Sequence, residues 1–242
     1  MLKTLAGGDS EYTMRINKYL AREGVATRRG ADELVAQGKV LINGRVAKLG
    51  EKINKGDKVE LRGKTSANKY LYYAYNKPIG TITHSPQMGE KDIKKSAGLP
   101  KDVFPVGRLD KDSSGLIILT NDGRVTDRLL NPKYEHDKEY RVRTGEPLRD
   151  SFKKIMEAGV NIEGYLTKSC TVRKTGPKSF NITLTEGKKH QIRRMVSALH
   201  NSVVGLERVR ILNIRLDNLA TGTWRAITGD ELATFLAQIG MK

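Results

Sequence analysis

Residues 107–123 read GRLDKDSSGLIILTNDG, and the organisation of the chain follows from this segment. A charged turn bounded by glycine lies between two apolar stretches, residues 103–106 and 116–119, that have the composition of strands. The Gly, Ser and Asp residues between them are typical of a turn that ends one strand and begins the next. The pattern therefore places Asp110 at a strand end, beside Arg108, where a fold can present a reactive carboxylate.

The charge of the chain indicates a polyanionic partner. Its 242 residues include 44 Lys or Arg and 27 Asp or Glu, which gives a formal net charge of +17. The basic excess occurs both in residues 13–63 and in residues 64–242, so it is not confined to a tail. A charge of this size costs self-repulsion unless a partner neutralises it, and nucleic acid is favoured over an anionic membrane.

The cysteine content and the hydropathy indicate a cytoplasmic protein. Cys170 is the single cysteine, so an internal disulfide is excluded. It lies in an alternating stretch that predicts a small buried side chain rather than a nucleophile. The sequence has no run of about 18 apolar residues that could span a bilayer, and its start lacks the long apolar stretch of a signal peptide. We therefore expect no membrane association.

Residues 13–63 have the pattern of a small separate unit, preceded by a loose leader at residues 1–12. Two helices are predicted there, the first closed by Gly24 and the second capped by Thr27. Asn43-Gly44 then separates two short apolar stretches. Asn-Gly is the strongest short hairpin signal, because both central residues of such a turn take positive φ. Residues 64–70 are polar and predict a linker.

Residues 71–242 predict a larger domain of the α+β class. Strands with alternating apolar faces are expected at residues 139–144 and 180–184, and residues 84–100 are polar and aperiodic, which indicates a long loop. Interspersed helices are expected at residues 124–130, 150–158, 190–199 and 229–239. Strand-rich segments with interspersed helices favour a mixed, mainly antiparallel sheet.

The N-terminal unit resembles a known RNA-binding module. Residues 15–61, RINKYLAREGVATRRGADELVAQGKVLINGRVAKLGEKINKGDKVEL, are similar to the S4-type domain, in which two helices carry basic side chains toward an RNA backbone. Arg28 and Arg29 begin the second predicted helix, where free backbone N–H groups also favour an anion. The resemblance implies seven candidate phosphate contacts: Arg15, Lys18, Arg22, Arg28, Arg29, Lys39 and Arg45.

The larger domain resembles the pseudouridine synthases of the small-subunit ribosomal RNA type, which join an S4-type domain to a catalytic one. The resemblance rests on five motifs in the order AYNKPIG (74–80), GRLDKDSSGLIILTNDG (107–123), HDKEYRV (136–142), EGKKHQIRRM (186–195) and LERVRILNI (206–214). Within that family, LERVRILNI and the ending GTWRAITGDEL (222–232) are most similar to the F-type enzymes of large-subunit ribosomal RNA.

The resemblance implies that Asp110 is the catalytic carboxylate. Conversion of uridine to pseudouridine breaks the N-glycosidic bond, rotates the uracil and rejoins it through carbon 5, so no redox step and no cofactor is needed. A carboxylate supplies the nucleophile or the negative charge that such a reaction requires near the sugar. Asp112 is the competing candidate, but its place in Asp-Ser-Ser-Gly is typical of a turn-forming side chain.

A basic partner for Asp110 is expected on the predicted helix at residues 190–199. Ile192, Met195, Val196 and Leu199 form its apolar face, and Arg193 borders that face whereas Arg194 points further away. An adjacent guanidinium keeps a half-buried carboxylate ionised. The family resemblance implies the same residue, Arg193, as the partner of Asp110.

Three further residues are assigned by the resemblance and by their type. Tyr140 is expected to stack on the uracil and to take part in the late proton removal, with a core tyrosine as the alternative. Because the target uridine must leave its stack, the planar guanidinium of Arg108 is a candidate to fill the vacated space, and a structural bond to a carbonyl is equally possible. Lys77 is a candidate contact to a phosphate or sugar.

The sequence predicts a monomeric enzyme that acts on structured RNA. Large-subunit ribosomal RNA is the expected substrate, together with a transfer RNA anticodon stem-loop, and small-subunit RNA is the alternative. A non-catalytic S4-type assembly protein is a second class. A metal-dependent phosphoesterase using Asp110 and Asp112 is a third, but His84, His136, His190 and His200 lack metal-ligand spacing, and no metal site is expected.

Overall fold

The computed structural model describes residues 3–5, 13–62, 70–83, 93, 98 and 103–241. The chain divides into two compact units: Met1–Leu71 with Asn121–Val125, and Tyr72–Thr120 with Thr126–Lys242. Most of the leader, the linker and the loop predicted over residues 84–100 lie outside the described residues.

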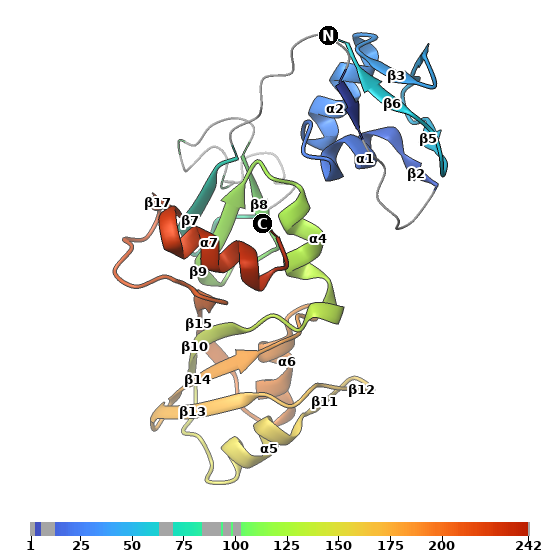
Figure 1. Cartoon of the computed structure of the whole chain (residues 1–242). Helices are drawn as coiled ribbons and strands as arrows, with labels where there is room; N and C mark the ends of the chain where they lie inside the picture. The colour runs from blue at the N-terminus through green and yellow to red at the C-terminus, as the bar shows by residue number, and fades with distance from the viewer. Residues whose placement is uncertain are drawn as a thin grey trace. The chain divides into compact units, whose positions relative to one another are not determined.

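The first unit combines two helices with short strands (Figure 1). Its helices are α1 (Ile16–Arg22) and α2 (Arg28–Ala36). Its strands are β1 (Lys3–Leu5), β2 (Met14–Arg15), β3 (Val40–Ile42), β4 (Arg45–Val46), β5 (Lys52–Ile53) and β6 (Val59–Leu61). Strands β1, β6, β3 and β4 form one sheet in that order, and β2 pairs with β5.

Local sequence rules explain most of this unit. Gly24 has φ of 72°, which closes α1 as predicted, and the Thr27 hydroxyl accepts a hydrogen bond of 3.1 Å from the Gly30 N–H at the start of α2. Asn43 and Gly44 both have positive φ, 51° and 80°, so β3 and β4 are joined by the predicted tight turn.

The start of the chain differs from the sequence prediction. Residues 1–12 were expected to be a loose leader, but Lys3–Leu5 form strand β1, which pairs antiparallel with β6 from Lys3↔Leu61 to Leu5↔Val59. Without β1, strand β6 would be an edge strand with unpaired backbone N–H and C=O groups. Three residues in an extended conformation can pair with these groups through their own backbone, which requires no particular sequence.

The second unit is built around a nine-stranded sheet. The main path runs β13, β14, β10, β15, β9, β7, β17, while β16 pairs with β15 and β8 pairs with β9. Its strands are β7 (Tyr72–Lys77), β8 (Phe104–Val106), β9 (Ser114–Thr120), β10 (Lys138–Thr144), β13 (Thr171–Gly176), β14 (Ser179–Leu184), β15 (Val203–Ile211), β16 (Ile214–Arg215) and β17 (Trp224–Ala226). Among the described pairings of this sheet only β9 with β15 is parallel, so the predicted mixed, mainly antiparallel sheet is confirmed.

Helices and a small hairpin complete the unit. They are α4 (Arg124–Leu130, whose first two residues group with the first unit), a 3₁₀ turn η1 (Pro132–Tyr134), α5 (Phe152–Ala158), α6 (Gln191–Ala198), α7 (Gly229–Gln238) and the hairpin β11 (Asn161–Ile162) and β12 (Tyr165–Leu166). The four predicted helices are confirmed with small shifts at their ends. None of the described helices is long and apolar enough to cross a membrane.

Helices α5 and α6 cover the half of the sheet that contains β10, β13 and β14 (Figure 1). Phe152 and Met156 of α5 and Ile192 and Met195 of α6 share one buried cluster with strand residues such as Phe180. Helix α7 is tied to β17 by the ion pair between Arg225 and Glu231, at 2.6 Å. Separate helices therefore pack at the two ends of the sheet, and strands β15, β9 and β7 lie between these ends.

Candidate active site

The turn that carries Asp110 joins β8 to β9, as the sequence predicts. These strands pair antiparallel from Phe104↔Thr120 to Val106↔Ile118, and the turn between them begins at Gly107, with φ of 79°. The Thr83 hydroxyl accepts from the Leu109 N–H at 3.2 Å and donates to the Leu109 carbonyl at 2.8 Å. The backbone next to Asp110 is therefore fixed.

The Asp110 carboxylate is half-exposed and pairs with a histidine. Its Oδ1 lies 3.4 Å from Nε2 of His190, and the side chains are 38% and 47% exposed. His190 precedes α6 and has a left-handed backbone, with φ of 52°. Its position at the helix start was expected, but its contact with Asp110 was not, because nothing local in the sequence links residues 80 positions apart.

Arg193 reaches the same turn through backbone oxygens. Its Nη2 donates to the Asp112 carbonyl at 2.9 Å and its Nη1 to the Val203 carbonyl at 3.1 Å. It borders the buried face of α6 as predicted, but the recorded contacts of its guanidinium are to these carbonyls and the Ser113 hydroxyl. The direct pairing of Arg193 with Asp110 stays a prediction.

Tyr140 is half-buried on β10. Its ring packs against the buried cluster that includes residues of α5 and α6. Tyr140 therefore contributes to the core, as the alternative interpretation of this residue expects. Tyr140 is opposite Arg208 of β15, whose guanidinium carbon lies 6.0 Å from the ring centroid. The stacking role toward a uracil stays a prediction.

Lys77 is fully buried rather than presented to solvent. Its ammonium donates to the carbonyls of Pro78 at 2.9 Å and Thr81 at 2.7 Å. Burial lowers its pKa to about 8, while the charges of Asp110 and Asp112 act in the opposite direction. These contacts fix the turn after β7, and a direct contact of Lys77 with RNA stays a prediction.

Arg108 and Asp112 lie on the exposed surface of the catalytic turn. The carbonyl of Arg108 faces the guanidinium of Arg208 at 3.5 Å, which leaves the Arg108 side chain outside that contact. Within the described residues, no three His, Cys, Asp or Glu side chains come close enough to hold a metal ion.

Three residues near the site were missed by the sequence analysis. They are His190, Arg208 and Lys138. Arg208 is 4% exposed. Burial, and after it the charge of Arg208, lowers the pKa of Lys138 to about 8. Lys138 and Arg208 lie inside recognisable motifs, but a charged residue in a strand gives no sequence signal of burial, since such residues are mostly exposed.

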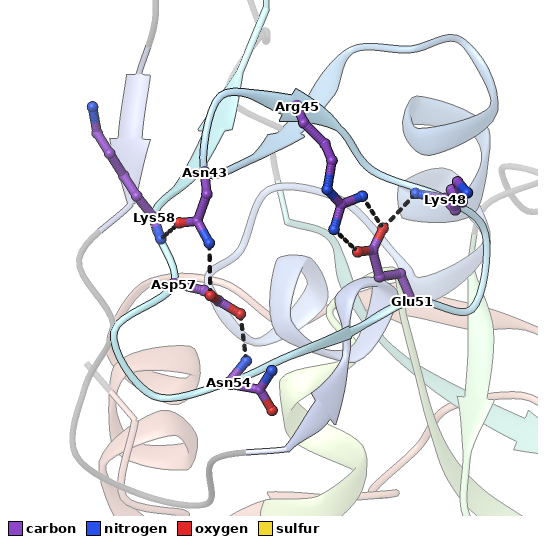
Figure 2. Close-up of polar contacts among 7 residues, drawn as sticks. All are labelled: Asn43, Arg45, Lys48, Glu51, Asn54, Asp57 and Lys58. Carbon is purple, nitrogen blue, oxygen red and sulfur yellow. Dashed lines mark hydrogen bonds and ion pairs between the residues drawn. The ribbon is translucent and has the colours of Figure 1, made fainter.

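The predicted RNA contacts of the first unit lie on or near α1, α2 and the β3–β4 hairpin. All are exposed except Arg22, which is half-buried and pairs with Glu23 at 3.2 Å. Figure 2 shows that Arg45 is engaged by the Glu51 carboxylate, which also accepts from the Lys48 N–H at 2.8 Å. The bond to Arg45 lowers the pKa of Glu51.

A second network in Figure 2 holds the adjacent loop. The Asn43 side chain donates to Asp57 at 2.8 Å and accepts from the Lys58 N–H at 2.8 Å, and Asp57 also accepts from the Asn54 N–H at 2.7 Å. The turn residue Asn43 therefore ties the β3–β4 hairpin to the segment around residues 54–58, and both are fixed by side-chain hydrogen bonds.

Comparison with known proteins identifies both units. Residues 71–198 match the RNA pseudouridylate synthase family, and residues 14–59 match the S4 domain. The chain belongs to the RNA pseudouridine synthase family. The family resemblance inferred from the five motifs is thus confirmed, as is the S4-type character of the N-terminal unit.

Several members of the family are similar over most of the chain. The dual-specificity RNA pseudouridine synthase RluF of Salmonella typhi is 41% identical over 228 residues, which cover 92% of this chain and 78% of that protein. Ribosomal large subunit pseudouridine synthase B of Bacillus subtilis is 35% identical over 90% of this chain and 93% of its own. A crystal structure of a pseudouridylate synthase has a TM-score of 0.69 at 30% identity and covers 91% of this chain and 99% of its own.

Proposed function

We propose that this pseudouridine synthase acts on a uridine of large-subunit ribosomal RNA, with Asp110 as its catalytic carboxylate. The observation that carries the proposal is the half-exposed Asp110 carboxylate on a turn whose backbone is fixed by Thr83. A fixed, accessible carboxylate is what the reaction requires. Two relatives support the choice of RNA: one is named for the ribosomal large subunit, and the other is named as a dual-specificity RNA pseudouridine synthase.

The reaction is an isomerisation. The bond between the ribose and uracil N1 breaks, the base rotates, and a bond from the ribose to carbon 5 forms, after which the proton on carbon 5 leaves. No atom is gained or lost overall, and no oxidant or reductant takes part. Asp110 supplies the negative charge at the sugar while the base is detached. The nucleotide must first leave its stack to reach this carboxylate.

The neighbouring residues have separate roles in this proposal. Tyr140 contacts the detached uracil and assists the final proton removal. Arg193, bonded to the Asp112 carbonyl, keeps positive charge beside Asp110. Arg108, exposed on the same turn, fills the space that the flipped base leaves.

The S4-type unit supplies electrostatic attraction to RNA. Its seven candidate cations neutralise phosphates, with Arg28 and Arg29 at the start of α2 as the strongest pair. A transfer RNA anticodon stem-loop is the second proposed substrate, as the F-type resemblance implies, and a dual specificity in the name of RluF is compatible with a second RNA. We expect the enzyme to act as a monomer in the cytoplasm, where these RNAs are found.

The test compares Asp110→Asn with Asp112→Asn, a matched control on the same turn. Each purified variant is incubated with transcripts of large-subunit RNA, small-subunit RNA and a transfer RNA anticodon stem-loop, and pseudouridine is mapped chemically. Asp110→Asn should lose at least about 10⁴-fold in rate, as expected for removal of a nucleophile. Asp112→Asn should stay close to the parent, because Arg193 contacts the backbone of Asp112 and not its side chain.

Each contrary result has a distinct meaning. Full activity of Asp110→Asn would reject Asp110 as the catalytic carboxylate, and loss of activity only in Asp112→Asn would transfer the role to Asp112. Modification of small-subunit RNA alone would overturn the proposed substrate. Absence of pseudouridine in every transcript, with RNA still bound, would favour the S4-type assembly protein.

A further inference from the structure

Arg208 is a buried arginine on the central strand β15, and it has no role in the function proposed for Asp110, Tyr140, Arg193 and Arg108. It is 4% exposed. Its Nε donates to the Leu116 carbonyl at 2.7 Å, and its Nη1 lies 3.5 Å from the Arg108 carbonyl. These two carbonyls lie on either side of the turn that carries Asp110. One planar side chain therefore joins the two ends of the catalytic turn.

The backbone around Arg208 brings four motifs into one row across the sheet. Arg208 of β15 is opposite Tyr140 of β10 on one side and Gly115 of β9 on the other, and Gly115 is in turn opposite Lys77 of β7. The row Tyr140, Arg208, Gly115, Lys77 thus contains one residue from each of four sequence motifs. A residue in the middle of this row can set the spacing between Tyr140 and the Asp110 turn.

Gly115 makes the approach of β15 to the turn possible. A Cβ at this position would lie 2.3 Å from the Arg208 carbonyl oxygen and 2.7 Å from its nitrogen, and Gly115 has φ of +102°. Such a distance is far below any contact between a carbon and an oxygen, so only glycine fits. The Arg208 side chain bonds the carbonyls of Arg108 and Leu116, and its guanidinium carbon lies 6.0 Å from the centroid of the Tyr140 ring.

Stability alone does not explain a charged residue at this position. The Arg208 Nη2 is buried and has no hydrogen-bond partner among the described residues. A buried guanidinium with an unsatisfied donor costs free energy, and an apolar side chain of similar size would often be at least as stable. The charges of Lys77 and Lys138 add repulsion to that cost.

We infer that Arg208 is a positioning residue, which holds the Asp110 turn at a fixed distance from Tyr140. The inference rests on the proposed roles of Asp110 and Tyr140. Lysine retains the charge but lacks the planar fork that bonds two carbonyls at once. The geometry of the arginine, and not its charge, is therefore what catalysis needs.

The test uses Arg208→Lys and Arg208→Met, with Arg210→Lys as a matched control. Arg210 lies on the same strand and pairs with Glu139 at 2.9 Å, away from the catalytic turn. Single-turnover rates and RNA affinities are measured below the melting temperature of each variant. Both Arg208 variants should bind RNA as the parent does and react about 100-fold more slowly, as expected for a misplacement of about 1 Å. Arg210→Lys should keep the parent rate.

Two results would overturn the inference. One is the parent rate in either folded Arg208 variant, since methionine fills the site without the unsatisfied donor and gives a second chance of a folded protein. The other is a fall in RNA affinity that accounts for the whole loss of rate. Asp110→Asn is measured in parallel: if it is inactive while Arg208→Lys is fully active, only the role of Arg208 fails, and if it is active, the proposed role of Asp110 fails.

Discussion

Lys77 lies fully buried next to the catalytic turn, and Lys138 lies half-buried two residues from Tyr140. Burial is the first cause that lowers the pKa of each to about 8, and the charge of Arg208 acts in the same direction. Both ammonium groups donate to carbonyl oxygens, that of Lys138 to His136 at 3.0 Å. The carbonyl dipoles partly compensate these two charges. The removal of the charges from water still costs folding free energy.

The pH dependence of stability should report this cost at Lys138. Below pH 8 both folded and unfolded states bind the proton, and the folded state bears the whole cost of the buried charge. Between about pH 8 and the unfolded pKa of about 10.4 the folded state releases its proton first, so stability rises with pH. Lys138→Met removes this term. Its unfolding free energy relative to the parent should fall by up to about 3 kcal/mol between pH 7 and pH 10.

Urea unfolding at several pH values measures this difference. Lys154→Met serves as the control, because Lys154 is an exposed lysine on α5. A constant difference between Lys138→Met and the parent across this pH range would contradict the lowered pKa of Lys138.

At the scale of elements, the row across β10, β15, β9 and β7 explains why the site needs a glycine. Gly115 starts the buried part of β9, and its close approach to Arg208 sets the only described parallel pairing of the large sheet. The same strand pairs with β8, which leads into the Asp110 turn. The close contact between β9 and β15 at Gly115 therefore also fixes the orientation of the turn between β8 and β9.

Gly115→Ala should therefore destabilise the second unit strongly. The added Cβ would meet backbone atoms at 2.3 Å and would require an unfavourable φ of +102°, so we expect a loss of at least about 3 kcal/mol of unfolding free energy. Gly123→Ala is the matched control, since nothing lies within 4 Å of its Cβ position. Urea unfolding measures both, and equal stabilities would show that β15 can move away from β9 at low cost.

At the scale of the whole molecule, the net charge of +17 should govern RNA affinity. Each phosphate contact contributes about −0.7 to −0.9 to the slope of log affinity against log salt. Replacement of both Arg28 and Arg29 by glutamine should therefore make the slope shallower by about 1.4 to 1.8. Filter binding over a range of salt concentrations measures this change.

Two controls define the result. Lys154→Gln removes an exposed charge from α5 of the second unit and should leave the slope close to that of the parent. An unchanged slope in the Arg28 and Arg29 variant would exclude the start of α2 as a phosphate contact. The single-turnover rate at saturating enzyme should stay at the parent value, because these residues belong to the S4-type unit.

Features that depend only on neighbouring residues could be predicted from the sequence. The Asn43-Gly44 turn, the Thr27 cap, the apolar face of α6 and the strands around Asp110 follow from φ preferences and side-chain periodicity, which act over a few residues. The family also follows from the sequence, because its motifs are short and contiguous.

The contacts between distant motifs could not be predicted in this way and became visible in the folded structure. Strands paired across long stretches of chain bring His190 to Asp110 and bury Lys77 fully and Lys138 in part. They also place Arg208 between Tyr140 and Gly115. Strand β1 depends on the free edge of β6 in the same way. The physical reason is that pairing and burial are set by the sheet as a whole, whereas the residue types of the motifs are compatible with several arrangements.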